Sequence, residues 1–109
     1  MNTVAADPIP LCQAADIALG EALRVEVPGY PALAVFNLNG VFHVIDDRCT
    51  HGDASLAEGE IDREDGVVEC PWHQGAFDIA TGKPCSAPCS IPLRTYRAVV
   101  RDGVVMLEG

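Results

Sequence analysis

Two short cysteine–histidine pairs constrain this chain more than any other feature of its sequence. Cys49 and His51 form the first pair, and Cys70 and His73 form the second after eighteen intervening residues. Thiolate and imidazole are ligands for zinc and for iron. The segment Gly59–Glu69 between the pairs has the pattern of a strand, a turn and a second strand, which would bring both loops together. The sequence therefore predicts a metal site shared by two loops.

The length of the chain limits what can surround such a site. With 109 residues, 49% of them hydrophobic, it can build one compact domain but not two of ordinary size. Ten glycines and eight prolines interrupt most segments that could have become long helices. We therefore expect a single β-rich domain over residues 1–109 rather than a helical bundle.

Hydrophobic alternation and turn residues outline an outer scaffold. Short alternating, β-branched or aromatic runs predict strands over Ala22–Val27, Ala32–Leu38, Val41–Ile45, Tyr96–Arg101 and Val104–Glu108. Asn39-Gly40 and Asp102-Gly103 supply the two positive φ angles that a two-residue hairpin turn requires. The scaffold then spans about residues 1–45 and 90–109, and a metal-binding insert lies between its halves at about 46–89.

Negative charge is concentrated in the insert. Seven lysines and arginines against sixteen aspartates and glutamates give a net charge of −9, and residues 46–69 carry −7 of it through nine acids and two arginines. An acidic domain repels phosphate backbones, which excludes nucleic acid as a partner. The acidic segment is either a docking surface for basic partners or a solvated face.

The apolar runs are too short for a membrane protein. None approaches the roughly 18 residues needed to span a bilayer, and the first ten residues lack the basic start and apolar core of a signal peptide. We therefore expect a cytoplasmic protein without a membrane anchor.

Five cysteines, an odd number without a secretory signal, argue against a disulfide framework. Cys12, Cys85 and Cys89 fall outside the two pairs, and we expect them to be buried or half-buried free thiols. His43 occupies an alternating position in a predicted strand, which favours a structural or exposed histidine over a ligand.

The mixed composition of each pair bears on the choice between zinc and iron. Common zinc folds place two cysteines in the first pair and two histidines or two further cysteines in the second. One cysteine and one histidine in each pair is expected when each loop gives one ligand to each of two irons, as in a Rieske centre. A zinc-stabilised interaction module is the alternative.

Three longer motifs carry a resemblance to a known family. They are Cys49-Thr50-His51-Gly52-Asp53, Cys70-Pro71-Trp72-His73-Gln74-Gly75-Ala76-Phe77-Asp78 and Thr81-Gly82-Lys83-Pro84. The chain resembles the Rieske 2Fe-2S proteins, specifically the small ferredoxin components of bacterial aromatic-ring-hydroxylating dioxygenases. This resemblance implies an all-β fold, with an antiparallel β-sandwich or barrel scaffold and an inserted cluster-binding subdomain. It also implies one Rieske-type 2Fe-2S cluster bound by Cys49, His51, Cys70 and His73.

Positions near these ligands imply a low reduction potential. High-potential Rieske proteins carry a second cysteine in each loop, joined as a disulfide, where this chain has Ala54 and Trp72. They also carry a serine and a tyrosine whose hydroxyls donate toward the cluster, where this chain has Gly75 and Phe77. With fewer donors the added electron is less stabilised, so the potential should lie near the lower end of the Rieske range, roughly −150 mV.

Two further features near the motifs have an implied role. Pro84, Ala87 and Pro88 resemble the proline-containing loop that covers the cluster in this family. Trp72, which precedes a ligand, is either packed in the core or part of a docking face.

The resemblance implies a carrier rather than a catalyst. Such a ferredoxin takes one electron from a NAD(P)H-dependent flavin reductase and passes it to a terminal oxygenase, docking weakly with each partner in turn. An oxygenase subunit would need two histidines and a carboxylate besides the two cluster histidines, and the chain has only three histidines. We expect a monomer. A Rieske ferredoxin that serves a different oxidoreductase is a further alternative.

Overall fold

Short strands make up most of the regular secondary structure. A computed structural model describes residues 8–50, 54–72, 75–87 and 91–108. Its strands are β1 (Ile9–Gln13), β2 (Ala22–Val25), β3 (Leu33–Leu38), β4 (Val41–Asp46), β5 (Glu60–Asp62), β6 (Val67–Glu69), β7 (Ala76–Asp78), β8 (Pro84–Ser86), β9 (Thr95–Tyr96), β10 (Ala98–Arg101) and β11 (Val104–Leu107). Two 3-10 turns, η1 (Ala14–Asp16) and η2 (Leu56–Glu58), are the helical segments of these ranges. Neither has the length or the apolar character to cross a membrane.

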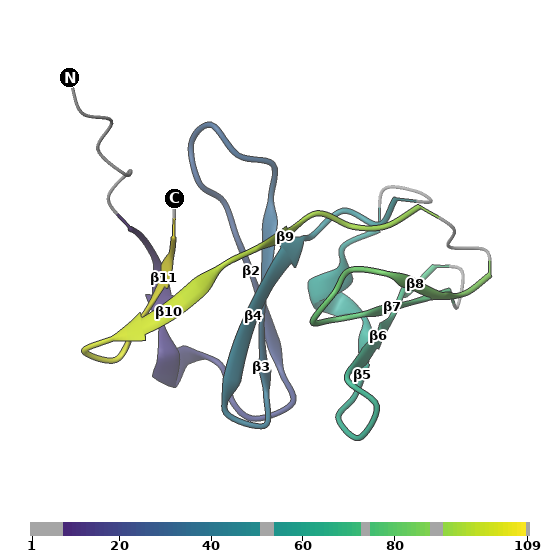
Figure 1. The fold of residues 1–109 in the computed structure, drawn as a ribbon, viewed down its shortest axis with the longest axis horizontal. Helices are drawn as coiled ribbons and strands as arrows, with labels where there is room; N and C mark the ends of the chain where they lie inside the picture. Colours follow the sequence, from purple (N-terminus) through teal and green to yellow (C-terminus); the bar gives the residue numbers. More distant parts are fainter. Residues whose placement is uncertain (1–7, 51–53, 73–74, 88–90, 109) are drawn as a thin grey trace.

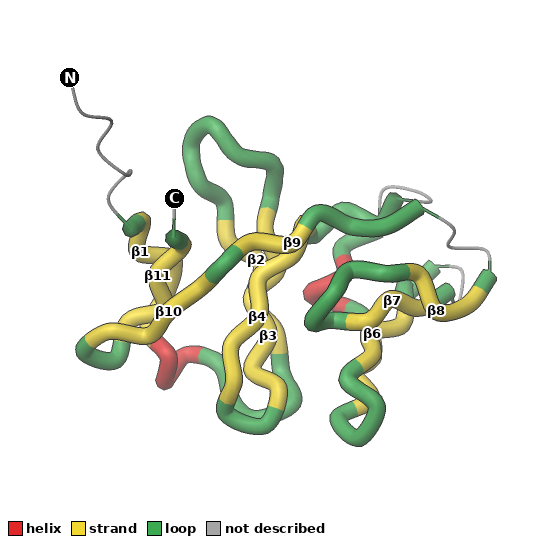
Figure 2. The backbone as a smooth tube through the Cα atoms, in the orientation of Figure 1, coloured by secondary structure: helices red, strands yellow, loops and turns green. Residues whose placement is uncertain are grey.

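Three antiparallel sheets build the fold (Figure 1). The first has the order β2-β3-β4-β9 and the second has the order β1-β11-β10. The third, β5-β6-β7-β8, is formed by the stretch of chain between β4 and β9. Figure 1 shows this third sheet at the end of the molecule away from both termini, and Figure 2 shows long loops around its strands. The expected antiparallel all-β class is confirmed.

Both predicted hairpin turns are present. Asn39 and Gly40 have φ angles of 56° and 91°, and Asp102 and Gly103 have φ angles of 52° and 78°. The first turn joins β3 to β4 and the second joins β10 to β11, each as a two-residue connection. Because Asn, Asp and Gly tolerate the left-handed region, these dipeptides fix the register of both hairpins.

β3 is buried on both faces. Leu33 and Val35 belong to the scaffold core, whose buried residues are Ile17, Val27, Leu33, Val35, Val44, Val105 and Leu107. Ala34 and Phe36 face the other way into the insert core, whose buried residues are Ala34, Phe36, Ile45, Cys49, Ala54, Leu56, Val68, Cys70, Phe77, Ile79 and Leu93. A strand with two buried faces is a continuous apolar run rather than an alternating one, and β3 begins with such a run. It therefore links the two cores.

The third sheet begins with the hairpin predicted between the two pairs. β5 and β6 pair antiparallel from Glu60 opposite Glu69 to Asp62 opposite Val67. Its tip also contacts the β3–β4 turn, because the Asn39 side-chain amide donates to the Arg63 carbonyl at 3.3 Å. The insert is thus held to the scaffold at its far end as well as at its base.

The strand pattern of the sequence does not predict β7 and β8. Two further departures have a cause in the sheet topology. The sequence pattern does not predict β1, which contains Pro10; the strand is nevertheless possible because β1 lies at a sheet edge, where proline is tolerated. The predicted strand Tyr96–Arg101 is divided into β9 and β10. The division has a topological cause, since β9 pairs with β4 in one sheet and β10 pairs with β11 in another.

Candidate metal centre

Two buried cysteines lie in the part of the chain that forms the insert. Cys49 follows β4 and Cys70 follows β6, and each is only 1% exposed. Both belong to the insert core, where apolar side chains such as Phe77 and Leu56 surround them. The fold therefore brings the two predicted thiol ligands into one apolar environment.

Each cysteine closes its loop in the same way. The backbone N–H of Cys49 donates to the Ala54 carbonyl at 3.0 Å, and that of Cys70 donates to the Gly75 carbonyl at 2.6 Å. Each bond joins residues five positions apart, and one predicted histidine ligand falls between them in the sequence. His51 and His73 lie outside the described residues. The two cysteines thus have equivalent positions in two similarly closed loops.

The stems of the two loops differ. The second loop continues a regular ladder, in which Glu69 of β6 lies opposite Ala76 of β7. The first loop has a single bridge, between Arg48 and Ser55, and its returning segment runs directly into η2. The first loop therefore needs other contacts to fix its shape.

Asp47 supplies such contacts and is the site residue that the sequence pattern does not reveal. It is 2% exposed, and its Oδ1 accepts hydrogen bonds from Ser55 Oγ and from the Ala57 N–H, both at 2.9 Å. In the sequence it is one of nine acids in a charged segment. The signal that could have distinguished it is its place at the end of a strand, directly before a ligand loop.

A third segment lies against the first loop. Thr50 Oγ1 donates to the Ile91 carbonyl at 2.7 Å, and the Leu93 N–H donates to the Gly82 carbonyl at 2.8 Å. A pocket of about 360 Å³ beside the first loop is lined by Pro31, Asp46, Arg48, Cys49, Thr50 and Ile91. The contacts tie the chain that leaves the insert to the base of the candidate site.

The implied covering loop is only partly described. Pro84 is half-buried in β8 and Ala87 is exposed, whereas Pro88 lies outside the described residues. The Ile91 contact is the described feature that links this part of the chain to a ligand loop. The covering role stays a prediction.

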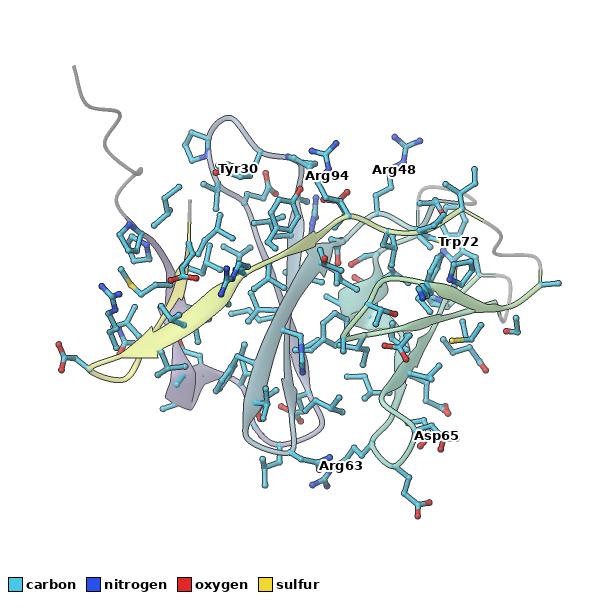
Figure 3. The ribbon with its side chains drawn as sticks, in the orientation of Figure 1. Tyr30, Arg48, Arg63, Asp65, Trp72 and Arg94 are labelled. Carbon is cyan, nitrogen blue, oxygen red and sulfur yellow. The ribbon has the colours of Figure 1, made fainter. Side chains whose placement is uncertain are left out.

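Two large apolar side chains are exposed beside the loops. Trp72 is 62% exposed and Ile91 is 60% exposed. Figure 3 places Trp72 at the end of the molecule that carries the insert. Of the two interpretations of Trp72, this exposure argues against packing in the core and leaves a docking role as the other interpretation.

The cysteines outside the pairs behave differently from one another. Cys12 is a half-buried free thiol, and burial, with a smaller contribution from the Asp16 charge, raises its pKa. Cys85 is also a free thiol, but it is exposed, so the expectation of burial is wrong for this residue. It lies in β8, an edge strand of the third sheet with little packed over it. Cys89 lies outside the described residues.

His43 is half-buried in β4, as expected of a structural histidine. Burial lowers its pKa, and the charge of Asp78 partly offsets that effect. Across the described ranges, no three His, Cys, Asp or Glu side chains converge on a common metal position.

Cys49 and Cys70, the two predicted ligands that lie in the described residues, fit an iron–sulfur cluster. Both thiols are buried in apolar surroundings, at equivalent positions of two loops whose sequences each contain one histidine. Cysteines and histidines divided in this way match a centre with two thiolates on one iron and two imidazoles on the other.

Comparison with known proteins identifies the family. The model of the Rieske [2Fe-2S] domain matches residues 7–97. The chain is 46% identical over 103 residues to the ferredoxin component of the p-cumate 2,3-dioxygenase system of Pseudomonas putida, a match that covers 94% of this chain and 86% of that protein.

Solved structures agree with the sequence match. The Sphingomonas yanoikuyae B1 ferredoxin has a TM-score of 0.89 at 43% identity, covering 94% of this chain and 99% of that one. The complex of reduced oxygenase and oxidized ferredoxin in carbazole 1,9a-dioxygenase contains a chain with a TM-score of 0.86 at 41% identity, covering 94% of this chain and 93% of that one. By sequence and by fold, the chain belongs to the Rieske [2Fe-2S] domain family.

Proposed function

We propose that the chain is the electron-transfer ferredoxin of a multicomponent aromatic-ring dioxygenase. It carries one electron at a time from a NAD(P)H-dependent flavin reductase to a terminal oxygenase. The observation that carries the proposal is the pair of similarly closed loops, each with a buried cysteine at its base and a histidine in its sequence. Support comes from relatives that are named as dioxygenase ferredoxins, one of them solved in a complex with an oxygenase.

Four residues would hold the 2Fe-2S cluster. Cys49 and Cys70 would bind one iron as thiolates, and His51 and His73 would bind the other through neutral imidazoles. When bound, the cluster supplies a reversible one-electron acceptor. Two ferric ions, two sulfides and two thiolates sum to zero charge, so this ligand set accepts an electron more easily than four thiolates would.

The residues around the thiols favour a low potential. Ala54 and Phe77 are almost completely buried in the insert core, and neither side chain can donate a hydrogen bond. Gly75 has no side chain to contribute. The chain therefore stabilises the added electron less than a protein with hydroxyl donors at these positions would.

The exposed apolar side chains beside the loops suit transient contact with partners. Trp72 and Ile91 lie on the segments that carry or contact the ligand loops, so a partner that covers them approaches the site directly. Redox encounters of this kind are small, below roughly 1,200 Å² in total. We infer a cytoplasmic monomer that meets both partners in turn.

The acidic segment would act mainly through long-range electrostatic attraction of a partner. Four of its acids, Glu60, Asp62, Glu64 and Glu69, line a pocket of about 560 Å³ along the β5–β6 hairpin. Figure 3 shows Asp65 at the hairpin tip, on the opposite side of the insert from Trp72. Charge there would attract a basic partner, and the attraction would weaken with salt.

The experiment that tests the proposal is a reductive titration of the purified protein. We expect a coloured protein that takes up one electron per chain from dithionite and, once reduced, bleaches the visible absorbance of an oxidised aromatic-ring dioxygenase. A colourless protein that contains zinc and gives no EPR signal after reduction would overturn the proposal. One-electron uptake without transfer to any dioxygenase would favour a ferredoxin of a different oxidoreductase.

A further inference from the structure

Asp47 is an almost fully buried carboxylate at the base of the first ligand loop. Its Oδ1 accepts hydrogen bonds from Ser55 Oγ and from the Ala57 N–H, and its Oδ2 lies 3.5 Å from Nε of Arg24 on β2. These contacts join three parts of the chain: the end of β4, the segment that returns from the loop, and the edge strand of the scaffold.

The main chain of Asp47 also contacts the scaffold and the returning segment. Its N–H donates to the Ala32 carbonyl at 2.9 Å, which fixes it to the scaffold. Its carbonyl accepts the Leu56 N–H at 2.7 Å, which fixes the returning segment. The residue is thus a junction between the scaffold and a returning segment whose described strand pairing is the isolated Arg48–Ser55 bridge.

The second loop has no need of such a junction. Its two sides are β6 and β7, whose ladder runs from Val67 opposite Asp78 to Glu69 opposite Ala76. The first loop instead returns into η2, and the first N–H groups of a short 3-10 turn lack partners within the turn. Asp47 Oδ1 accepts one of them, that of Ala57.

We propose that Asp47 is the positioning residue of the first ligand loop. Between the described residues on either side of the loop, its carboxylate takes the place of a strand ladder and holds the returning segment against the end of β4, next to Cys49. A buried carboxylate is costly unless it is hydrogen-bonded. The donors to Asp47, which belong to Ser55 and Ala57, lie on the returning segment, so the carboxylate gains these hydrogen bonds when the loop closes. The inference rests on the proposed function in one respect, that this loop binds a 2Fe-2S cluster.

Three variants of the full chain test the role. Asp47→Ala removes the acceptor, whereas Asp47→Asn keeps an oxygen that can accept both hydrogen bonds. Asp62→Ala is the matched control, because Asp62 Oδ1 also accepts two backbone N–H bonds, from Glu64 at 3.0 Å and Asp65 at 3.2 Å, but in the distal hairpin. The readouts are the rate at which visible absorbance is lost in EDTA and the g values of the reduced protein in EPR.

We expect Asp47→Ala to lose its absorbance roughly tenfold faster than wild type, because two donors lose their buried acceptor. Its g values should also shift, since they report the geometry of the metal ligands. Asp62→Ala should keep the wild-type rate and g values. Asp47→Asn keeps an acceptor for Ser55 and Ala57 but loses the charge that faces Arg24, so it should keep the wild-type g values and lose absorbance more slowly than Asp47→Ala. A role confined to folding stability would lower the unfolding midpoint of Asp47→Ala but leave the g values of its folded fraction unchanged.

The remaining outcomes also decide the question. If Asp47→Ala does not fold, Ser55→Ala replaces it, and the account requires faster loss of absorbance with wild-type far-UV circular dichroism. Wild-type g values and a wild-type loss rate in the variant that folds would overturn the proposal, as would equal effects of Asp62→Ala. A wild-type protein without a 2Fe-2S cluster would refute the proposed function instead, so the two failures are distinguishable.

Discussion

The scaffold and the insert are built on different principles. The scaffold contains the two longest strands, β3 and β4, with six residues each, and two-residue turns join β3 to β4 and β10 to β11. Every strand of the insert has three residues, and loops occupy much of the remaining length. The scaffold core contains only aliphatic side chains among its fully enclosed members, whereas the insert core includes two thiols.

The two parts therefore obtain their stability from different sources. β3 has six residues and buries both faces, so it gains apolar contact that does not require a metal. Three-residue strands are at the short end of what sheets contain, and small units of this kind commonly need a cross-link or a metal. The insert should therefore depend on its metal and on its junctions with the scaffold, and the scaffold should not.

Loss of a proposed thiol ligand should separate the two regions most strongly. We expect Cys49→Ser or Cys70→Ser to abolish the visible absorbance of the 2Fe-2S cluster, because each would remove one of the two thiolates proposed for the same iron. The scaffold should keep its β-sheet circular dichroism, while hydrogen exchange in residues 46–89 should become faster. The measurements are iron content, absorbance and residue-resolved exchange.

Cys85→Ser is the control for these variants, because Cys85 is an exposed free thiol on an edge strand. It should retain full colour. Full colour in Cys49→Ser or Cys70→Ser would contradict the ligand assignment.

Alanine should be tolerated less well at Gly82, which contacts the chain leaving the insert, than at Gly103 in the β10–β11 turn. Gly82 and Gly103 both have left-handed backbone angles, with φ of 75° and 78°, so alanine at either position costs about 1–2 kcal/mol. A Cβ at Gly82 would also collide with the Leu93 carbonyl oxygen, whereas a Cβ at Gly103 meets open space. We expect Gly82→Ala to lose about 1–3 kcal/mol more than Gly103→Ala in urea unfolding. Equal losses would show that the Gly82–Leu93 approach can relax.

The hydroxyl of Tyr96 joins the scaffold to the start of the insert. It donates to Asp46 Oδ1 at 2.7 Å, and Tyr96→Phe should cost about 1 kcal/mol of unfolding free energy. Burial, together with the hydrogen bond to Asp46, raises the pKa of Tyr96 from 10 to about 12. The folded form thus keeps a proton that the unfolded form loses, so this stability is present below pH 10 and is lost as the pH rises toward 12.

The check is the urea midpoint at several pH values. Wild type should lose more stability than Tyr96→Phe between pH 10 and pH 12. Parallel curves for the two proteins would show that the hydroxyl does not titrate with folding.

The smallest effect is expected at His43. Burial lowers its pKa below the ordinary 6.5, so the unfolded chain binds a proton more readily than the folded one. The stability that this histidine contributes is present above pH 6.5 and is lost as the pH falls below that value. His43→Asn should leave the visible spectrum unchanged and reduce the loss of stability on mild acidification. A changed spectrum would implicate His43 in the site.

The scaffold was the more predictable of the two regions, for a local reason. Asn39-Gly40 and Asp102-Gly103 determine their turns through backbone angles that few other dipeptides adopt. The break between β9 and β10 at Arg97 could not be predicted in this way, because it depends on which sheet each segment joins. β1 could not be predicted for a related reason. Pro10 is tolerated because β1 is an edge strand, and that position is known only from the whole sheet.

The sequence predicts ligands for the candidate site but does not predict the residues that support them. Cysteine and histidine spacing is visible along the chain, because a metal restricts which residue types can serve. The burial of Asp47 and the exposure of Cys85 and Trp72 are tertiary facts that residue type does not determine. Asp47 is one acid among nine in its segment, and only the fold separates it from the solvated ones.

Everything proposed above depends on two cysteines and two histidines of this chain binding one 2Fe-2S cluster. The proposed ligands can be tested by pulsed EPR on the reduced protein after labelling its histidines with ¹⁵N. We expect two strongly coupled histidine nitrogens, unchanged in His43→Asn and lost when His51 or His73 is replaced. A paramagnetic centre without coupling to histidine nitrogen, or a protein that never becomes paramagnetic on reduction, would contradict this assignment.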